Sequence, residues 1–547
     1  MPHVVTRACC NDASCVAVCP VNCIHPTPDE PDYGTTEMLY IDPAVCVDCA
    51  ACVEVCPVGA ISADYDLSDD QAGFEDINAH WYDGIGRRDY PQEQQEVRVR
   101  EWAGGDLRVA VVGAGPAAFY AAEGLLTQRG LEVRVDMFER LPTPGGLVRF
   151  GVAPDHQDTK DAARTFANTM RRKGLRLFLN TEVGTDITLD ALRARYHAVL
   201  VAVGALADRP LGIPGEELPG SHSATEFVGW YNGHPDFSHR TFDLSGERAV
   251  VVGNGNVALD IARILALGPD RLAKTDIADR ALEQLRSSTI REVVVIGRRG
   301  PAEASFTTKE LLSLARTPGV DVVVRPEELE AGQAGPAAPG GKVGALTELL
   351  GHRPGADRRI TLRFLAAPTE IIGDGWVEGV RLCRTRLVTD EDGVVRAVPT
   401  GDFEELACQL VFRSVGYRGS PVPGLPFDDE RGIIPNDDGR VIDPGTGDPV
   451  HGVYTAGWIK RGPSGSIGTN RKCAKDTVEH LLNDHRADRL PTPSEPGDIA
   501  DELPQHIGLG GWRLINEHEL DAGRRQHRPR VKLVDRAEML AVARRDG

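Results

Sequence analysis

Four cysteines near the N-terminus have the spacing of an iron–sulfur ligand set. Cys46, Cys49, Cys52 and Cys56 are followed by Pro57, which gives the pattern C-x2-C-x2-C-x3-C-P. Thiolates at this spacing can wrap a cuboidal iron–sulfur cluster, and in bacterial two-cluster proteins the fourth cysteine ligates the other cluster. A CxxC run can also bind zinc. Zinc does not readily explain two copies that each end in Cys-Pro, so the pattern predicts an electron-transfer domain.

The second copy lies upstream and is imperfect. It consists of Cys9, Asp12, Cys15 and Cys19, followed by Pro20. Asp12 stands where a cysteine is expected, and a hard carboxylate is a poorer ligand than a thiolate for iron in a sulfide cage. This copy therefore predicts a cluster site with one weak or vacant corner.

The spacing assigns the ligands of two sites. We expect a [4Fe-4S] cluster on four thiolates, namely Cys46, Cys49, Cys52 and Cys19. We expect a [3Fe-4S] cluster, or a [4Fe-4S] cluster with one labile iron, on Cys9, Cys15 and Cys56. Cys10 is an alternative to Cys9, but it would leave four residues before Cys15 and break the spacing. Cys23 is expected to be a buried bystander.

Short elements must position these cysteines. The β-branched and apolar residues at 4–6 and 38–42 predict strands. The i, i+4 spacing of Cys15 and Cys19, and of Cys52 and Cys56, predicts a helical turn at each place. Residues 1–82 are then one small domain whose core is marginal without its clusters. Residues 83–105 lack apolar periodicity and are expected to be a linker.

A first dinucleotide motif follows the linker. The buried-strand run at 109–112 leads into Gly113, Gly115 and Ala117 of G-x-G-x-x-A, and an amphipathic stretch continues to Leu126. Such glycines let the backbone approach a pyrophosphate at the N-terminus of a helix. The next strand ends at Glu139, a carboxylate that can bind ribose hydroxyls. This acid-bearing motif suits FAD.

A second motif repeats the pattern with a different strand end. A strand at 249–252 leads into Gly253-Asn254-Gly255-Asn256-Val257-Ala258, and the next strand at 293–296 is followed by Arg298 and Arg299. A guanidinium fork suits the 2′-phosphate that distinguishes NADP from NAD. Two surface arginines with no ligand are the alternative interpretation.

The two motifs predict the architecture of the rest of the chain. We expect an α+β ferredoxin-like domain, followed by an α/β flavoprotein in which an NADP domain is inserted into a Rossmann-like FAD domain. The expected boundaries are 106–207 for the first part of the FAD domain, 208–416 for the NADP domain and 417–547 for the second part of the FAD domain. Only Cys383, Cys408 and Cys473 lie in this region, far apart in sequence, which argues against a disulfide reductase.

The motifs also carry a family resemblance. Residues 2–82 resemble the bacterial seven-iron ferredoxins, although those proteins usually have two more residues between the first two ligands. Residues 106–547 resemble adrenodoxin reductase and its bacterial ferredoxin–NADP reductase relatives, through the segments 141–149, 151–156, 297–301 and 457–463. The whole chain is similar to the actinobacterial ferredoxin/ferredoxin–NADP reductase fusions.

The resemblance implies roles for individual residues. It implies FAD contacts at Ala117, Glu139, Leu147, Val183, Trp458, Gly465, Ser466 and Ile467. It implies NADP contacts at Arg209, Asn254, Gly255, Asn256, Val257, Arg298, Arg299, Glu310 and Gly465. His156 and Glu310 would lie near the nicotinamide and orient it. On the residues alone, His156 would be a structural loop histidine and Glu310 a solvated helix acid.

Composition limits the compartment and the partners. Residues 1–104 contain 19 Asp and Glu against five Arg, a net charge of −14 out of −20 for the chain. Such acidity argues against nucleic-acid binding, and it is explained either by solubility or by a face that meets basic redox partners. No apolar run approaches the roughly 20 residues of a membrane helix, and the N-terminus lacks a signal-peptide pattern. Nine of the twelve cysteines lie in residues 1–56, so we expect metal ligation in a reducing cytoplasm.

Three functions are compatible with these features. The resemblance favours a ferredoxin–NADP reductase, in which NADPH reduces FAD and single electrons pass through the fused clusters to an external ferredoxin or haem monooxygenase. The alternative is an electron-input subunit of a larger complex, like the small subunit of glutamate synthase. A redox sensor or iron store without enzyme activity is disfavoured by the two dinucleotide motifs.

Overall fold

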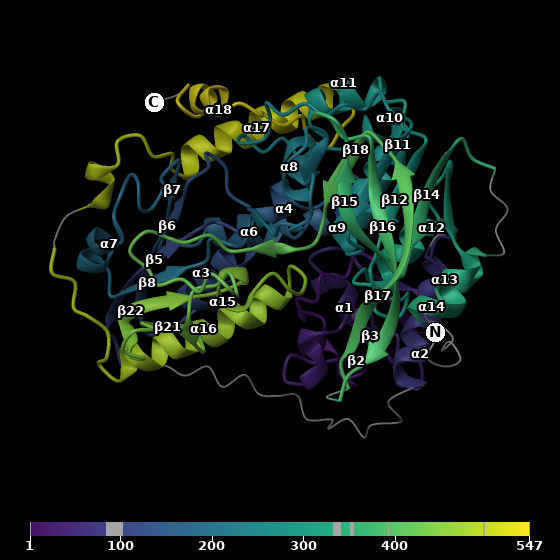
Figure 1. The fold of residues 1–547 in the computed structure, drawn as a ribbon. Coiled ribbons are helices and arrows are strands. Elements are labelled where there is room, and N and C mark those ends of the chain that lie inside the picture. The colour runs from purple at the N-terminus through teal and green to yellow at the C-terminus, as the bar shows by residue number, and fades with distance from the viewer. Residues whose placement is uncertain are drawn as a thin grey trace.

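Two large sheets stand side by side, and a small N-terminal domain, drawn in purple, lies beneath them in Figure 1. This computed structural model describes residues 2–69, 71–83, 102–331, 341–350, 355–391, 393–495 and 498–545. The expected linker at 83–105 therefore lies largely outside the described residues.

The N-terminal domain contains two antiparallel strand pairs. Its elements are β1 (His3–Val5) with β4 (Ile61–Ala63), β2 (Ile24–His25) with β3 (Tyr40–Ile41), and the helix α2 (Gly73–Asp83). Asn78 of α2 ties the pairs together, because its Oδ1 accepts N–H bonds from Val5 at 3.2 Å and from Ile41 at 2.9 Å. The strand expected at 38–42 is shorter, since its partner β2 ends at His25 and the next residue, Pro26, has no N–H to donate.

Helical turns hold the cysteines, as the spacing predicted. A 3-10 turn, Val16–Val18, lies between Cys15 and Cys19, and α1 (Ala51–Val55) includes Cys52. The cysteines are part of the small core, together with Val5, Ile24 and Ile41. Two more 3-10 turns, Pro31–Gly34 and Asp64–Asp66, complete the domain.

The first large sheet is the Rossmann-like scaffold of the acid-bearing motif. Its strand order is β20-β21-β22-β8-β5-β6-β7, and the strands from β22 to β7 are parallel. The strands are β5 (Asp106–Val112), β6 (Glu132–Glu139), β7 (Leu175–Leu179), β8 (Ala198–Val201), β20 (Asn436–Asp437), β21 (Arg440–Ile442) and β22 (Pro449–Thr455). The strand order reverses between β5 and β8, which is where ligands bind in open α/β sheets.

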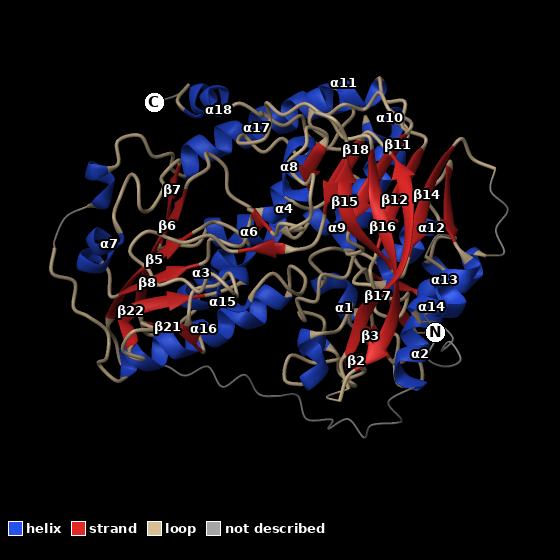
Figure 2. Cartoon of the chain, viewed as in Figure 1, coloured by secondary structure: helices blue, strands red, loops and turns tan. Residues whose placement is uncertain are grey.

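Helices cover this sheet, as Figure 2 shows in blue. They are α3 (Pro116–Leu126), α4 (Leu147–Phe150), α5 (Gln157–Lys160), α6 (Ala163–Met170), α7 (Leu189–Arg195), α15 (Trp458–Arg461) and α16 (Thr469–Arg486). α3 and α16 pack against one another through residues such as Ala121, Val478 and Leu481, so the helix that begins at the glycine loop is firmly held.

The second large sheet carries the arginine-bearing motif. Its six strands are parallel, in the order β10-β18-β11-β12-β14-β13. They are β10 (Ser221–Ser223), β11 (Arg248–Val252), β12 (Glu292–Ile296), β13 (Val320–Val324), β14 (Arg358–Arg363) and β18 (Leu410–Arg413). Its helices are α8 (Ala224–Tyr231), α9 (Asn256–Ala266), α10 (Pro269–Leu272), α11 (Asp279–Arg286), α12 (Thr308–Ala315), α13 (Pro326–Ala331) and α14 (Lys342–Leu349).

The chain passes between the two sheets through one short strand pair. β9 (Ala207–Asp208) pairs with β19 (Tyr417–Arg418), so the chain enters and leaves the second sheet at the same place. An antiparallel sheet, β15 (Ala366–Ile372), β16 (Gly379–Thr389) and β17 (Val395–Ala407), also lies within this insertion. The expected fold class, with one dinucleotide-binding domain inserted into another, is confirmed, while the residue boundaries stay a prediction.

The C-terminal segment joins the two domains. After the turn Ile499–Glu502, α17 (Leu509–Arg525) and α18 (Arg536–Ala543) run along the top of the molecule in Figure 1. Lys532 Nζ lies 2.8 Å from Asp276 in the inserted domain, and Arg149 is paired with Glu519 of α17 at 2.5 Å. Both pairs are buried, and breaking a buried pair leaves an uncompensated charge, so these contacts tie the C-terminal segment to each domain.

Candidate functional site

A cavity of about 1620 Å³ lies between the two dinucleotide-binding domains. A site for one drug-sized ligand usually encloses about 300–1,000 Å³. The walls of this cavity come from both glycine motifs and also from the N-terminal domain, through Arg7, Cys9, Cys10 and Glu37. The volume and the two motifs therefore fit more than one ligand in a shared space.

The first glycine loop is shaped for close backbone approach. Gly113 has φ +105°, and a Cβ there would overlap the carbonyl oxygen of Ala202. Glu139, at the end of β6, is buried, and its carboxylate accepts N–H bonds from Ala114 at 2.9 Å and Leu141 at 3.0 Å. Burial raises the pKa of Glu139. Each carboxylate oxygen keeps a free lone pair, so the group can still accept from ribose hydroxyls.

The second glycine loop has the same geometry and the opposite charge at the strand end. Gly253 has φ +115°, and a Cβ there would overlap the carbonyl oxygen of Ser414. Gly255 precedes α9 and leaves the first N–H groups of that helix facing the cavity. Arg298 and Arg299 follow β12, are exposed and line the same cavity. Their guanidinium groups are available to an anionic ligand.

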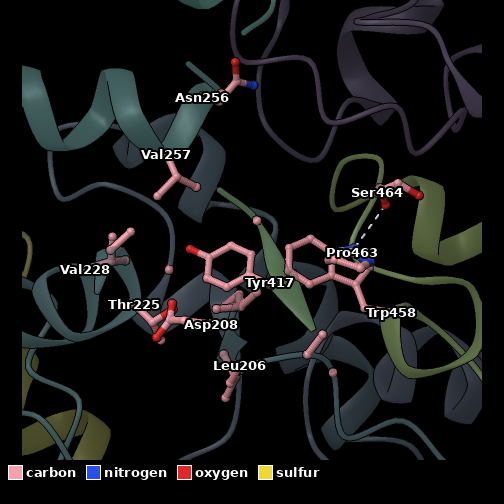
Figure 3. Close-up of a pocket in the computed structure, with 18 of the residues that line it drawn as sticks. Leu206, Asp208, Thr225, Val228, Asn256, Val257, Tyr417, Trp458, Pro463 and Ser464 are labelled. Atoms are coloured by element: carbon pink, nitrogen blue, oxygen red, sulfur yellow. Dashed lines mark hydrogen bonds between the residues drawn. The ribbon is translucent and has the colours of Figure 1, made fainter. Parts of the chain in front are cut away.

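Aromatic rings line the cavity where the two domains meet. Tyr417 of β19 stacks on Trp458, with ring centroids 5.9 Å apart (Figure 3). Trp458 Nε1 donates a hydrogen bond to the carbonyl of Ser464 at 3.1 Å, which is the dashed line in Figure 3. Asn256 and Val257, at the start of α9, lie above Tyr417 in Figure 3, and Trp458 lies to its right. The crossing strands thus place a flat apolar surface beside the second glycine loop.

The structure brings the predicted cofactor residues together in this one cavity. Its lining includes residues from both motifs and from distant loops: Gly113, Gly115, Ala117, Glu139, Leu147, His156, Val183, Arg209, Asn254, Gly255, Asn256, Val257, Arg298, Arg299, Glu310, Trp458, Gly465, Ser466 and Ile467. Their individual contacts with FAD or NADP stay predictions.

His156 and Glu310 meet in a buried cluster of charges. His156 Nε2 lies 3.9 Å from Glu310 Oε2, and His156 Nδ1 lies 4.0 Å from Asp260 Oδ1. Burial, together with the charge of Arg263, lowers the pKa of His156 to about 3, so the imidazole is neutral at neutral pH. Burial opposes the ionised form of Glu310, but nearby positive charges, Arg7 and Arg263 among them, hold the pKa of its carboxyl below the usual range.

Arginine balances the carboxylates of this cluster. Arg263 is buried, and it contacts Asp155 at 2.6 Å and Asp260 at 2.8 Å. The ligand atoms of His156, Asp260 and Glu310 lie within 4.8 Å of one another, a spacing that can also hold a metal ion. Because Arg263 offsets part of this carboxylate charge, and burial raises the pKa of Asp260 to about 7, the cluster is better suited to orienting a neutral polar group than to binding a cation.

The four cysteines expected to hold the [4Fe-4S] cluster lie together, while the assignment of ligands to two clusters stays a prediction. We call Cys19, Cys46, Cys49 and Cys52 the outer cysteine group. They line a second, small cavity with Cys23. Cys23 is buried as expected but is in contact with the group, because its Sγ lies 3.4 Å from Cys19 Sγ and its N–H points to the same sulfur. These bonds lower the pKa of Cys19 to about 6, which favours the thiolate that ligates iron.

We call Cys9, Cys15 and Cys56 the inner cysteine group. Burial raises the pKa of the Cys15 thiol, and the neighbouring groups Cys9, Asp12 and Cys56 raise it further. Cys9 and Cys10 also line the large cavity, whereas the outer cysteine group does not. The sulfur-rich donor sets of both groups fit iron–sulfur clusters.

The inner group is fixed to both large domains. Lys309 Nζ of α12 donates to the carbonyl of Cys9 at 2.7 Å. Ser466 Oγ and Gly468 N donate to the carbonyl of Cys10 at 2.8 and 2.7 Å. A Cβ on Gly468 would overlap the backbone of Asn11 and Asp12, so this approach requires glycine.

Asp12 has a second task that the motif did not indicate. Its Oδ2 lies 3.0 Å from Arg471 Nη1 and accepts a hydrogen bond from Ser14 at 2.5 Å. The residue that replaces a cysteine therefore forms an ion pair across the domain interface. Sequence reasoning had placed Asp12 only at the weak corner of a cluster.

Other site residues also escaped the sequence analysis. Arg7, Asp260, Arg263, Lys309 and Tyr417 line the cavity or charge cluster without belonging to a motif. Arg7 is one of only five arginines in the acidic residues 1–104, and that rarity was the available signal. The others become visible only when the fold brings the elements together.

Comparison with known proteins agrees with this construction. A family model described as "4Fe-4S dicluster domain" matches residues 8–60, and one described as "Pyridine nucleotide-disulphide oxidoreductase" matches residues 107–313. A probable ferredoxin/ferredoxin–NADP reductase of Mycobacterium tuberculosis is 49% identical over 99% of this chain and 95% of its own length. NADPH-ferredoxin reductase FprA of the same organism is 50% identical over 79% of this chain and 98% of its own.

A solved structure shows the same fold. The structure of M. tuberculosis FprA in complex with NADPH has a TM-score of 0.75 and 49% sequence identity, and covers 80% of this chain and 99% of that one. Mouse NADPH:adrenodoxin oxidoreductase is 42% identical over 80% of this chain and 91% of its own.

Fold and site together define an oxidoreductase with two dinucleotide-binding domains and a fused dicluster iron–sulfur domain. Its cavity and cysteine groups are built for FAD, NADP and iron–sulfur clusters. The chain belongs to the family of ferredoxin/ferredoxin–NADP reductases. Among the described residues, no helix combines the length and apolar character needed to cross a membrane.

Proposed function

We propose that this protein is a self-contained NADPH–ferredoxin reductase, which moves electrons from NADPH to its own iron–sulfur clusters and then to an external redox protein. FAD, when bound, accepts a hydride and releases electrons singly, which matches a two-electron donor to one-electron clusters. The observation that carries the proposal is the shared cavity, which both glycine motifs and the loop of the inner cysteine group line.

The residues of the chain have distinct tasks in this proposal. Gly113, Gly115 and Glu139 hold one dinucleotide, whereas the second glycine loop with Arg298 and Arg299 holds the NADP 2′-phosphate. Neutral His156 and ionised Glu310 orient the nicotinamide. The chemistry needs no covalent catalyst, because positioning the donor against the acceptor is sufficient.

The finer assignments belong to the same proposal. The outer cysteine group would hold a [4Fe-4S] cluster, and the inner group a [3Fe-4S] cluster or a labile [4Fe-4S] cluster. The external partner is a ferredoxin or a haem monooxygenase, and the acidic N-terminal domain favours a basic face on it. The twelve cysteines are all free, which suits a reducing cytoplasm.

Anaerobic mixing of the purified holoenzyme with NADPH tests the route. We expect the visible flavin absorbance to bleach and reduced-cluster EPR signals to appear in the same sample. A low-potential electron acceptor is then added to the same sample. If the flavin bleaches and this acceptor is reduced while the clusters stay oxidised, electrons leave the flavin directly, which would contradict a route through the N-terminal domain.

A double variant tests the cofactor assignment. Arg298→Ala with Arg299→Ala removes a charge-assisted contact, so NADPH affinity should fall about tenfold to a hundredfold while NADH affinity changes little. Arg291→Ala is the matched control, because Arg291 is an exposed arginine at the opposite end of β12. An equal loss of affinity for NADPH and NADH would contradict the assignment of the 2′-phosphate site to these arginines.

A further inference from the structure

The N-terminal domain inserts a positive charge into the reductase cavity. Arg7 lies between β1 and Cys9, lines the large cavity and has a side chain only 17% exposed. The carbonyl of Cys9, two residues on, is held by Lys309 of α12. The next residue of α12 is Glu310, and Arg7 Nη1 lies 3.9 Å from Glu310 Oε1. The docked domain therefore brings Arg7 to the charge cluster of the large domains.

Arg7 and Glu310 face each other with unused hydrogen-bonding atoms. Arg7 Nη1 and Glu310 Oε2 are both buried, and neither has a hydrogen-bond partner among the described residues. The 3.9 Å between Arg7 Nη1 and Glu310 Oε1 is too long for a hydrogen bond. Glu310 Oε2 is also 3.9 Å from His156 Nε2. Buried polar atoms are almost always satisfied in folded proteins, so two such atoms that line one cavity indicate a ligand group.

The pair offers one donor and one acceptor of fixed character. A guanidinium stays protonated in proteins and only donates, and an ionised carboxylate only accepts. A primary carboxamide is the complement, because its carbonyl oxygen accepts and its amino group donates. A phosphate would meet Glu310, and an ammonium group would meet Arg7, so a fully charged group of either sign is disfavoured at this point.

The position of the pair agrees with the nicotinamide end of an NADP molecule. The start of α12 is tied to the second glycine loop, because Phe306 N donates to the Asn254 carbonyl at 2.8 Å and Thr307 N donates to Asn256 Oδ1 at 2.8 Å. Glu310 lies one helical turn beyond that tie. The arginines expected to bind the 2′-phosphate follow the end of β12, and Glu310 lies on a different element, α12.

We propose that Arg7 is a positioning residue for the nicotinamide, supplied by the fused domain: the carboxamide oxygen accepts from Arg7 and the carboxamide N–H donates to Glu310. This inference rests on the proposed function, because it assumes that NADP occupies the cavity. It makes the N-terminal domain a part of the nicotinamide site as well as an electron carrier. Docking of the domain then completes the site.

Binding to the oxidised holoenzyme, measured by calorimetry without turnover, tests the inference. The three ligands are NADP⁺, 2′,5′-ADP, which lacks the nicotinamide, and the 3-acetylpyridine analogue of NADP⁺, which keeps the carbonyl but lacks the amide N–H. Arg7→Ala should weaken NADP⁺ and the acetylpyridine analogue about tenfold, as expected for a lost hydrogen bond to a charged group, and leave 2′,5′-ADP unchanged. Arg7→Lys should recover part of the NADP⁺ affinity. Glu310→Ala should weaken NADP⁺ more than the acetylpyridine analogue.

A matched variant separates this role from domain docking. Arg471→Ala breaks the interface ion pair with Asp12 but lies outside the lining of the cavity. It should leave the ratio of NADP⁺ to 2′,5′-ADP affinity at the wild-type value. If Arg471→Ala lowered the ratio of NADP⁺ affinity to 2′,5′-ADP affinity as much as Arg7→Ala does, the effect would belong to docking, and the inference would be overturned. Unchanged NADP⁺ affinity in Arg7→Ala would also overturn it. Failure of wild-type protein to bind 2′,5′-ADP would instead refute the proposed NADP site.

Discussion

The two cysteine groups come from two copies of one motif, and their surroundings differ. In the outer group Cys49 is exposed, and Val47 beside it is 57% exposed. In the inner group Cys9 and Cys15 are buried, and Lys309 of α12 and Ser466 of the loop before α16 hold the carbonyls of Cys9 and Cys10. One motif therefore serves two different tasks. The group that faces the cavity is suited to receiving electrons, and the group that faces solvent is suited to passing them on.

The contrast extends to the residue that differs between the two copies. The outer group has four thiols, and the inner group has Asp12 where a fourth is expected. Asp12 forms an ion pair with Arg471 and accepts from Ser14. The acid that stands in place of the expected cysteine therefore takes part in an interface contact. A cysteine at this position would favour a four-iron cluster but would give up the ion pair with Arg471.

Removal of a thiol from the outer group should have the largest effect. Cys46→Ser leaves three thiolates, so we expect loss of the [4Fe-4S] EPR signal and of NADPH-driven reduction of an added ferredoxin, while NADPH still bleaches the flavin. Because the clusters support a small core, the melting temperature of the N-terminal domain should also fall. Cys383→Ser, which alters a buried thiol of β16, should keep the iron content of the wild type. Undiminished ferredoxin reduction in Cys46→Ser would mean that electrons do not leave the protein through the outer cysteine group.

Separation of the inner group from the cavity should have the next largest effect. Gly468→Ala places a methyl group against the backbone of Asn11 and Asp12. Overpacking of this kind costs about 1–3 kcal/mol, so cluster reduction after NADPH mixing should slow about tenfold, whereas flavin bleaching persists. Stopped-flow absorbance at separate wavelengths measures both steps. Gly510→Ala in α17, where a Cβ meets no atom within 4 Å, should change neither rate. An unchanged cluster rate in Gly468→Ala would show that the docking seen here is not needed for transfer.

A change of ligand at the inner group should have the smallest effect on turnover and a clear effect on spectra. Asp12→Cys supplies a fourth thiolate, so the EPR signal of an oxidised three-iron cluster should disappear after iron reconstitution. Asp12→Asn is the control, because it removes the Arg471 ion pair without adding a thiol. That surface pair contributes about 1 kcal/mol or less, so both variants should transfer electrons only a few times more slowly. A persistent three-iron signal in Asp12→Cys would place Asp12 away from the open corner.

Much of the fold was predictable, because its signals are local. The runs of Val before Gly113 and Gly253 predict strands, and both lead directly into helices in the structure. Glu139 and Arg298 have opposite charge at equivalent strand ends, and that difference could be read without the fold. The cysteine spacing likewise predicted the helical turns near Cys15 and Cys52, since each turn depends on residues three or four positions apart, while the assignment of ligands to two clusters stays a prediction.

The contacts between domains were not predictable, because they join residues far apart in the chain. Lys309 and Cys9 meet across 300 positions, and Arg471 and Asp12 across 459. Neither pair has a local pattern, and Lys309 would be assigned to a solvated helix face from its neighbours alone. The strand β3 was predicted too long for a similar reason. Its length depends on a distant residue, Pro26, which follows the partner strand β2.

The contact of Gly468 and Ser466 with Cys10 also determines how the enzyme responds to dilution. With residues 9–12 held on α12 and on the loop before α16, transfer from the cavity to the clusters is a first-order step within one chain. Its rate is independent of protein concentration, as for any tethered pair with a high effective concentration. A free ferredoxin could reach the same surface only by displacing the N-terminal domain, which is covalently attached to the reductase. Only the last transfer, from the outer group to a separate protein, would slow as the solution is diluted.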